Sequence, residues 1–290
     1  MPPPPAPTKP LRILMLHGYT QSGPLFRAKT RALEKHLAKA FPSGASLVYP
    51  TAPHRLSPAD IPVWDNSAPA PVSTEPLDCY AWWTRADTNP PTYTGLAQGL
   101  ARVAECLKTE GPFDGVVGFS QGGALAGMVA SLLETGRPEA FGAYAESVKS
   151  GGKWWAGGLE KWKDLKFDAD TYPASFLNAD GTVCHAPMKF AAIYSGFKAP
   201  HPAYGAYFSP KIATPTVHFL GSVDTVVVED RSLALVDVCV EPRIVRHPGG
   251  HFLPASQKEW VGALIAFMRE SLESKVDKKE ERVEDMELPF

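Results

Sequence analysis

The sequence predicts an α/β fold in which helices cover both faces of a mostly parallel sheet. Short runs of apolar or β-branched residues alternate along the chain with longer segments of helical periodicity. Strands that alternate with helices form parallel βαβ units, and a sheet built from such units is covered on both faces. With 290 residues and a hydrophobic content of 44%, the chain is able to form one large domain with a sizeable core.

The predicted strands are short and the predicted helices are longer. Strands are expected at residues 11–16, 46–49, 115–119, 190–194, 216–220 and 243–246. Helices are expected at residues 25–40, 95–109, 121–135, 231–236 and 258–273. This order assigns residues 11–272 to a single domain.

The two ends of the chain differ in composition from this domain. Residues 1–10, "MPPPPAPTKP", are rich in proline and predict a disordered leader. Residues 273–290 are dense in mixed charge and poor in apolar residues, which predicts a flexible tail. The start of the chain shows no signal-peptide pattern.

Two long internal stretches, residues 51–94 and 136–187, also fit the alternation poorly. We interpret both as loop or lid insertions, because structureless connections of this length are unusual inside a compact domain. Trp82 and Trp83 lie in the first of them. These aromatic side chains either seal the loop onto the core or line an apolar substrate pocket.

Charge and cysteine usage exclude several classes of protein. The net charge of −2 provides no basic field that would attract nucleic acid or an anionic membrane. The four cysteines are widely spaced and form no CxxC pair, so we expect free thiols in a reducing, cytoplasmic compartment and no metal site. The uncharged run 115–133 is long enough for a membrane span but is interrupted by five glycines, and we expect no span.

That uncharged run contains the first candidate for catalysis, Ser120 in the sequence Gly-Phe-Ser-Gln-Gly. A helix that begins directly after a buried strand requires a tight turn, which exposes the side chain at the turn. Gly118 and Gly122 suit such a turn because it has no room for a β-carbon. The placement between strand and helix predicts that Ser120 is a nucleophile, whereas an inert serine in a glycine-rich turn is the alternative.

A serine nucleophile needs a base and an acid, and the sequence offers both in loops after later strands. His251 follows a strand and a Pro-Gly-Gly turn in "RIVRHPGGHFLP", and we prefer it to His247, which ends the strand. Asp224 follows the strand in "TPTVHFLGSVDTVV"; a turn-capping role is its alternative. The order Ser120, Asp224, His251 is typical of the α/β-hydrolase arrangement. Phe252, beside the predicted base, joins Trp82 and Trp83 as a candidate substrate-binding residue.

Acyl transfer also requires donors for an oxyanion. The backbone N–H of Gln121, which follows the nucleophile, is one candidate. The backbone N–H of Tyr19 in "LHGYTQSG" is the other, because Gly18 allows the chain to turn inward before it. The same loop lacks GxGxxG spacing, and the chain contains neither a P-loop nor a metal-ligand cluster, so we expect no cofactor.

Taken together, "LRILMLHGYTQSG", "FDGVVGFSQGGALAGMVASLL", "FAAIYSGFKAP", "TPTVHFLGSVDTVV" and "HPGGHFLP" resemble the fungal serine hydrolase (FSH) family. This family includes the ovarian-cancer-associated serine hydrolases and is related to acyl-protein thioesterases. The resemblance covers residues 11–268 and implies an α/β-hydrolase fold, with Ser120, Asp224 and His251 as the triad. The connection 136–187 is longer than is usual in the family, so substrate specificity does not carry over. Ser195 in "YSGF" matches a family feature and is interpreted as structural.

We therefore expect a serine hydrolase that cleaves carboxylic esters or thioesters of apolar acyl groups, including carrier-bound thioesters of secondary metabolism. A lactone or amide hydrolase of the same fold is an alternative. A protein of another class, which binds a ligand in the hydrolase pocket without hydrolysing it, is a second alternative, and scaffolding through the charged tail is a third. The oligomeric state is not predicted.

Overall fold

A computed structural model describes residues 9–61, 77–151 and 164–273. Within these residues a six-stranded parallel sheet forms the centre of the molecule, in the order β10-β9-β8-β7-β1-β2. Its strands are β1 (Leu11–Leu16), β2 (Ala45–Val48), β7 (Gly115–Phe119), β8 (Phe190–Tyr194), β9 (Thr216–Gly221) and β10 (Arg243–His247). Because the strands are parallel, the loops that follow them all emerge at one edge of the sheet.

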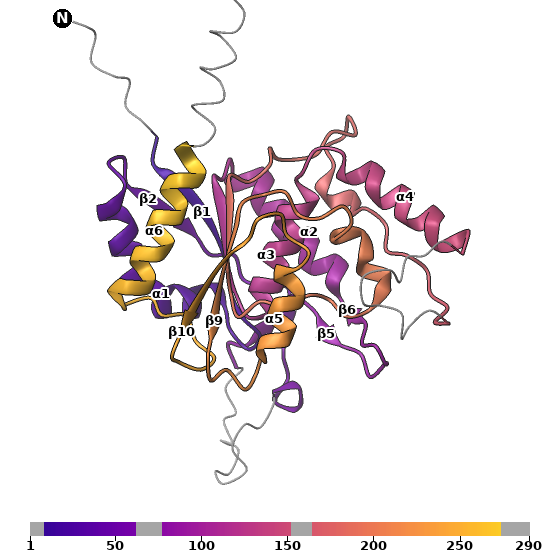
Figure 1. Cartoon of the computed structure of the whole chain (residues 1–290), viewed down its shortest axis with the longest axis horizontal. Helices are drawn as coiled ribbons and strands as arrows, with labels where there is room; N and C mark the ends of the chain where they lie inside the picture. Colours follow the sequence, from indigo (N-terminus) through magenta and orange to yellow (C-terminus); the bar gives the residue numbers. More distant parts are fainter. Residues whose placement is uncertain (1–8, 62–76, 152–163, 274–290) are drawn as a thin grey trace, which may run out of the picture.

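Helices pack on both faces of this sheet, as the sequence predicts (Figure 1). One face is covered by α1 (Gly23–Ala40) and α6 (Lys258–Glu273), and the other by α2 (Leu96–Glu110), α3 (Gln121–Leu132) and α5 (Glu229–Val236). Alternate residues of β1 point into the two cores: Ile13 joins the apolar cluster under α1 and α6, and Leu14 joins the cluster under α2 and α3.

The uncharged run 115–133 forms β7 and α3, with a sharp turn between them. Every residue of both elements is buried, and neither element contains a charged residue that would mark a solvent-facing side. Among the described helices, none combines the length and the apolar character needed to cross a membrane. The hydrophobicity of this run therefore reflects its position at the centre of the α/β core.

The predicted element bounds agree closely with the structure. The bounds of β1, β7, β8 and α6 are those predicted. Helix α3, which follows Ser120, ends earlier than expected, at Leu132. Free thiols are confirmed for all four cysteines, of which Cys106 and Cys239 are buried.

The prediction that residues 136–187 lack regular structure is wrong for their first part. Helix α4 (Arg137–Lys149) begins there, with Gly136 as its N-cap and a proline in its first turn. Its few buried residues give it weak helical periodicity, which explains why the sequence did not reveal it. A single turn of 3₁₀ helix follows at Ala174–Phe176. Residues 152–163 lie outside the described residues.

The other insertion, residues 51–94, contains short paired strands. β3 (His54–Arg55) pairs with β4 (Tyr80–Ala81), and β5 (Thr84–Arg85) pairs with β6 (Tyr93–Thr94). Short 3₁₀ turns occur at Pro58–Asp60 and, later in the chain, at Pro202–Tyr207. Residues 62–76 lie outside the described residues, as do residues 1–8 of the predicted leader and residues 274–290 of the predicted tail.

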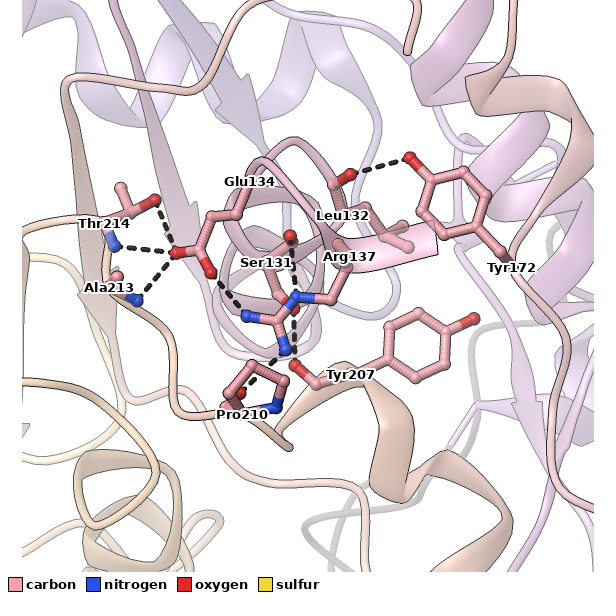
Figure 2. Close-up of polar contacts among 9 residues, drawn as sticks. All are labelled: Ser131, Leu132, Glu134, Arg137, Tyr172, Tyr207, Pro210, Ala213 and Thr214. Atoms are coloured by element: carbon pink, nitrogen blue, oxygen red, sulfur yellow. Dashed lines mark hydrogen bonds and ion pairs between the residues drawn. The ribbon is translucent and has the colours of Figure 1, made fainter. Parts of the chain in front are cut away.

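A buried ion pair between Glu134 and Arg137 holds the carboxyl end of α3 (Figure 2). Ser120 lies at the opposite end of this helix. The Arg137 guanidinium also donates to the carbonyl oxygens of Ser131 and Pro210. The Glu134 carboxylate accepts three further hydrogen bonds, from Ala213 N–H and from the N–H and hydroxyl of Thr214. These bonds satisfy both buried charges and add a donor to one carbonyl in the last turn of α3.

Replacing Arg137 with methionine is expected to destabilise the fold by about 3–5 kcal/mol, because it leaves the Glu134 carboxylate buried without its cation. Urea unfolding of the two proteins measures the difference. The matched control is Arg102→Met, which breaks a surface pair with Glu105 and is expected to cost less than about 1 kcal/mol. Equal losses in the two variants would contradict a stabilising role for the buried pair.

Candidate active site

Ser120 occupies the turn between β7 and α3, with a backbone φ of 54° and ψ of −117°. Positive φ is unusual for a residue with a side chain and marks a strained backbone. A β-carbon on Gly118 would lie 2.0 Å from the Gly122 oxygen, and one on Gly122 would lie 2.1 Å from the Leu16 oxygen. Both glycines are therefore required by backbone packing, which is the constraint that the sequence pattern indicated.

The structure brings Ser120, His251 and Asp224 together in one hydrogen-bonded chain. Ser120 Oγ lies 2.9 Å from His251 Nε2, and His251 Nδ1 lies 2.8 Å from Asp224 Oδ2. Because the carboxylate accepts from Nδ1–H, Nε2 is the ring nitrogen free to accept the serine proton. His247 does not take part: its Nδ1 accepts from Gly249 N–H, and its ring packs against Phe252 and Trp260.

The Asp224 carboxylate is held in its ionised form. Burial of its side chain, which is 3% exposed, raises the pKa of this carboxyl. Hydrogen bonds from His251 and from Val227 N–H, together with weaker contributions from Ser195 and the His251 charge, outweigh burial and leave the pKa of Asp224 below its ordinary value. Two backbone donors at 2.9 Å, Val226 N–H and Val227 N–H, fix the second oxygen. The carboxylate can thus orient His251 and stabilise its charged form.

The two proposed oxyanion donors lie in segments that contact each other. Within the described residues, neither the Tyr19 N–H nor the Gln121 N–H donates to another group. The Gln121 N–H opens helix α3, where free N–H groups favour negative charge. The loop that carries Tyr19 is fixed next to it, because Gly18 N–H donates to Gln21 Oε1 and Thr20 N–H donates to the Tyr80 oxygen.

The Gln121 side chain has a structural role that the sequence did not reveal. Its Oε1 accepts from Trp82 N–H at 2.9 Å, and its Nε2 donates to the Trp83 oxygen at 2.8 Å. Trp82 in turn donates its indole N–H to the His17 oxygen at 2.9 Å. These bonds join the turn at Ser120 to the loop after β1. Their partners are distant in sequence, so no local pattern could identify them.

His17 is a buried, neutral histidine in the same network. Its Nδ1–H donates to the Gly18 oxygen, and its Nε2 accepts from Ala52 N–H at 3.0 Å. Burial lowers the pKa of His17 to about 4. In a protonated ring, the Nε2–H of His17 would face the Ala52 N–H, and neither group could accept a hydrogen bond. The loop after β1 therefore requires the neutral form of His17.

Of the three predicted substrate-binding side chains, the structure places only Phe252 at a cavity near Ser120. Trp82 is 0% exposed and Trp83 is 2% exposed, and Trp83 stacks on Tyr93 with ring centroids 4.8 Å apart. Both tryptophans therefore lie in the core instead of facing a ligand. Phe252 is 39% exposed and lines a cavity of about 330 Å³ next to His251. The remaining lining residues are Gln21, Phe26, Lys29, Thr30, Phe119 and Leu253.

Among the described residues, His, Cys, Asp and Glu side chains form no cluster of three that could hold a metal ion. The groups that converge at the sheet edge are a hydroxyl, an imidazole, a carboxylate and backbone N–H donors. This set is suited to nucleophilic attack on a carbonyl group and to stabilisation of the resulting oxyanion.

The buried neutral state of His17 predicts an acid-sensitive fold. Burial lowers the pKa of His17 in the native state to about 4, whereas in the unfolded chain it is about 6.5. Between these two pH values the unfolded chain binds a proton at His17 and the native state does not. Stability is therefore lost as pH falls through this window, by up to about 1.4 kcal/mol per pH unit for this group. In urea unfolding between pH 7.5 and 4, the free energy of unfolding of His17→Gln should fall less steeply with decreasing pH than that of the wild-type protein. Part of the pH dependence should remain in this variant, because burial also lowers the pKa of His218 to about 4 and His218 is unchanged. Parallel curves for the two proteins would contradict this assignment.

Comparison with known proteins places these features in a family. Residues 7–263 match the family model described as "Serine hydrolase (FSH1)". The chain is 30% identical over 258 residues to "Esterase OVCA2" of Danio rerio, covering 85% of this chain and 92% of that protein. It is 29% identical over 252 residues to "Family of serine hydrolases 2" of Saccharomyces cerevisiae, covering 84% and 92% respectively.

Two further matches are informative in different ways. A Schizosaccharomyces pombe protein named "Dihydrofolate reductase" is 29% identical over 251 residues, but the chain spans only 44% of its length. The crystal structure of Zea mays acyl-protein thioesterase 2 shares the fold, with a TM-score of 0.52 and 19% identity over 91% of this chain and 96% of that one. The α/β-hydrolase fold predicted from the sequence is thereby confirmed. Because the family model spans most of the chain, this protein belongs to the FSH1 serine hydrolase family.

Proposed function

We propose that this protein hydrolyses carboxylic esters or thioesters of apolar acyl groups through Ser120, His251 and Asp224. The observation that carries the proposal is the continuous hydrogen-bonded chain from the Ser120 hydroxyl through His251 to the buried Asp224 carboxylate. The strained turn at Ser120 and the free N–H donors beside it support the same chemistry. The named esterases among the relatives agree with it.

The proposed reaction follows from the geometry of these groups. His251 Nε2 takes the Ser120 proton as the oxygen attacks the carbonyl carbon, and Asp224 stabilises the imidazolium that forms. The N–H groups of Gln121 and Tyr19 donate to the oxyanion of the tetrahedral intermediate. His251 then gives its proton to the departing alcohol or thiol. Water repeats the sequence on the acyl-enzyme and releases a carboxylic acid.

The cavity beside His251 supports an apolar acyl group. Three phenylalanines and Leu253 line it, and the Phe119 ring lies 4.9 Å from the His251 ring. Its volume of about 330 Å³ lies at the lower end of the usual range for ligand pockets. We assign Phe252 to substrate binding and withdraw that assignment for Trp82 and Trp83, because both tryptophans are buried. A thioester on a carrier, including one from secondary metabolism, is a narrower form of the proposal.

Replacing Ser120 with alanine should abolish hydrolysis of p-nitrophenyl esters and labelling by a fluorophosphonate probe. The expected loss of turnover is on the order of 10⁶-fold, because the nucleophile itself is removed. Mass spectrometry of the labelled wild-type protein should locate the adduct on Ser120. Ser195→Gly, at another strand end, keeps the nucleophile and should still be labelled. Turnover that survives in Ser120→Ala, or an adduct elsewhere, would refute the proposal.

Phe252→Ala should lower kcat/KM for p-nitrophenyl octanoate by about tenfold, the equivalent of about 1.4 kcal/mol of lost apolar contact. Hydrolysis of p-nitrophenyl acetate should change little, because a two-carbon acyl group does not reach the cavity wall. Val240→Ala removes a similarly exposed apolar side chain outside this cavity and serves as the control. Matched N-acetylcysteamine thioesters, assayed in parallel, give the preference between ester and thioester. An unchanged chain-length profile in Phe252→Ala would exclude this cavity as the acyl site.

A further inference from the structure

Ser195 lies at the sheet edge that carries the site, but the proposed mechanism does not use it. It is the first residue after β8, the strand between β7, which ends just before Ser120, and β9, which leads to Asp224. Its backbone N–H donates to the Phe219 oxygen of β9 at 2.9 Å. The side chain therefore emerges at the same edge of the sheet as the nucleophile and the acid.

The backbone of Ser195 is strained, with a φ of 46°. Glycine adopts this conformation without steric cost, whereas serine does not. Neighbouring groups impose the conformation: the Tyr194 oxygen accepts from Ser120 N–H, and the Gly196 oxygen accepts from the Ser232 hydroxyl at 2.8 Å. A side chain retained at a position that suits glycine indicates a function for its hydroxyl.

The hydroxyl of Ser195 is also buried without a hydrogen-bond partner. The residue is 2% exposed, and no described group lies in hydrogen-bonding geometry to its Oγ. Such a group is costly and calls for an explanation. A contribution from Ser195 lowers the pKa of Asp224, in keeping with a hydroxyl near that carboxylate, although the two groups do not meet in hydrogen-bond geometry here.

The Asp224 carboxylate has room for another donor. Its Oδ1 accepts from Val226 N–H and Val227 N–H, whereas Oδ2, among the residues that the structure describes, accepts only from His251 Nδ1. A carboxylate oxygen offers two lone-pair sites, so one site of Oδ2 remains available.

We propose that Ser195 is a positioning residue, whose hydroxyl donates a hydrogen bond to Asp224 while His251 carries the proton taken from Ser120. This inference rests on the proposed function. The bond keeps the carboxylate ionised and correctly oriented, so the proton stays on His251 until it passes to the leaving group. No bond within Ser195 forms or breaks, and the residue acts on the reaction only through Asp224.

Other charged groups near Asp224 bear on any test by pH. His251 approaches from the loop after β10, and His247 lies at the end of that strand. Arg231 approaches from α5 and donates weakly to the Val226 oxygen. The Asp224 charge raises the pKa of both His247 and Arg231, although burial lowers each of them overall. A test must therefore compare variants that leave these three residues in place.

The first test measures ester hydrolysis by Ser195→Ala and Ser195→Gly. Both should lower kcat about tenfold or more, the equivalent of one hydrogen bond to a charged group, with KM changed less than about twofold. The acid limb of the kcat/KM profile should move to higher pH, because a carboxylate without this donor leaves the Asp224–His251 pair more basic. Ser195→Gly should melt at a higher temperature than Ser195→Ala, because glycine relieves the backbone strain.

The control is Thr216→Val, which deletes another buried hydroxyl at the opposite end of β9 from Asp224. It should keep wild-type kcat and the wild-type acid limb. A purely structural role for Ser195 would lower the melting temperature without moving kcat or the acid limb, and that result would overturn the proposal.

A second readout does not depend on turnover. In the Ser120→Ala background, the proton resonance of His251 Nδ1–H should shift when Ser195 is also replaced by alanine, because the Asp224 acceptor changes. An unmoved resonance would overturn the proposal even if the wild-type protein hydrolysed no ester tested. Absence of Ser120-dependent hydrolysis, by contrast, would count against the proposed function and would leave the resonance to decide the role of Ser195.

Discussion

The backbone of the turn between β7 and α3 packs directly against its neighbours, and the geometry of the site depends on this contact. A β-carbon at Gly122 would collide with the Leu16 oxygen of β1, and one at Gly123 would come within 3.0 Å of the Tyr194 oxygen of β8. The first turn of α3 is therefore locked between the ends of two strands. That lock imposes the positive φ of Ser120 and holds its hydroxyl at the sheet edge.

The remaining groups reach Ser120 because the sheet is parallel. The loops after β8, β9 and β10 deliver Ser195, Asp224 and His251 to the same edge, although these residues are far apart in the chain. Each loop is then fixed by its own bonds: two N–H groups bind Asp224, and Ser232 binds the turn after Ser195. Groups held in this way need little reorganisation during a reaction, which is how polar sites gain catalytic power.

Both ends of helix α3 are fixed by polar contacts, and each set of contacts has a different consequence. At the far end, Arg137 and Glu134 are buried together and satisfy each other's charge. At the near end, the Gln121 side chain binds the backbone of Trp82 and Trp83, which joins the turn at Ser120 to the insertion 51–94. Polar groups buried in the core must find partners, so these bonds select one placement of the helix.

Elements whose signals are local could be predicted from the amino-acid sequence alone. The bounds of β1, β7, β8 and α6 followed from apolar runs and periodicity, and the turn at Ser120 followed from glycine spacing, because a crowded turn excludes β-carbons whatever surrounds it. Helix α4 escaped prediction because it buries few residues and so carries little periodicity. The burial of Trp82 and Trp83 in the core, and the burial of the Ser195 hydroxyl without a partner, are evident only in the folded structure. An aromatic ring or a hydroxyl has the same chemistry in a pocket as in a core. Its role depends on contacts with residues distant in sequence, and the folded chain alone brings those together.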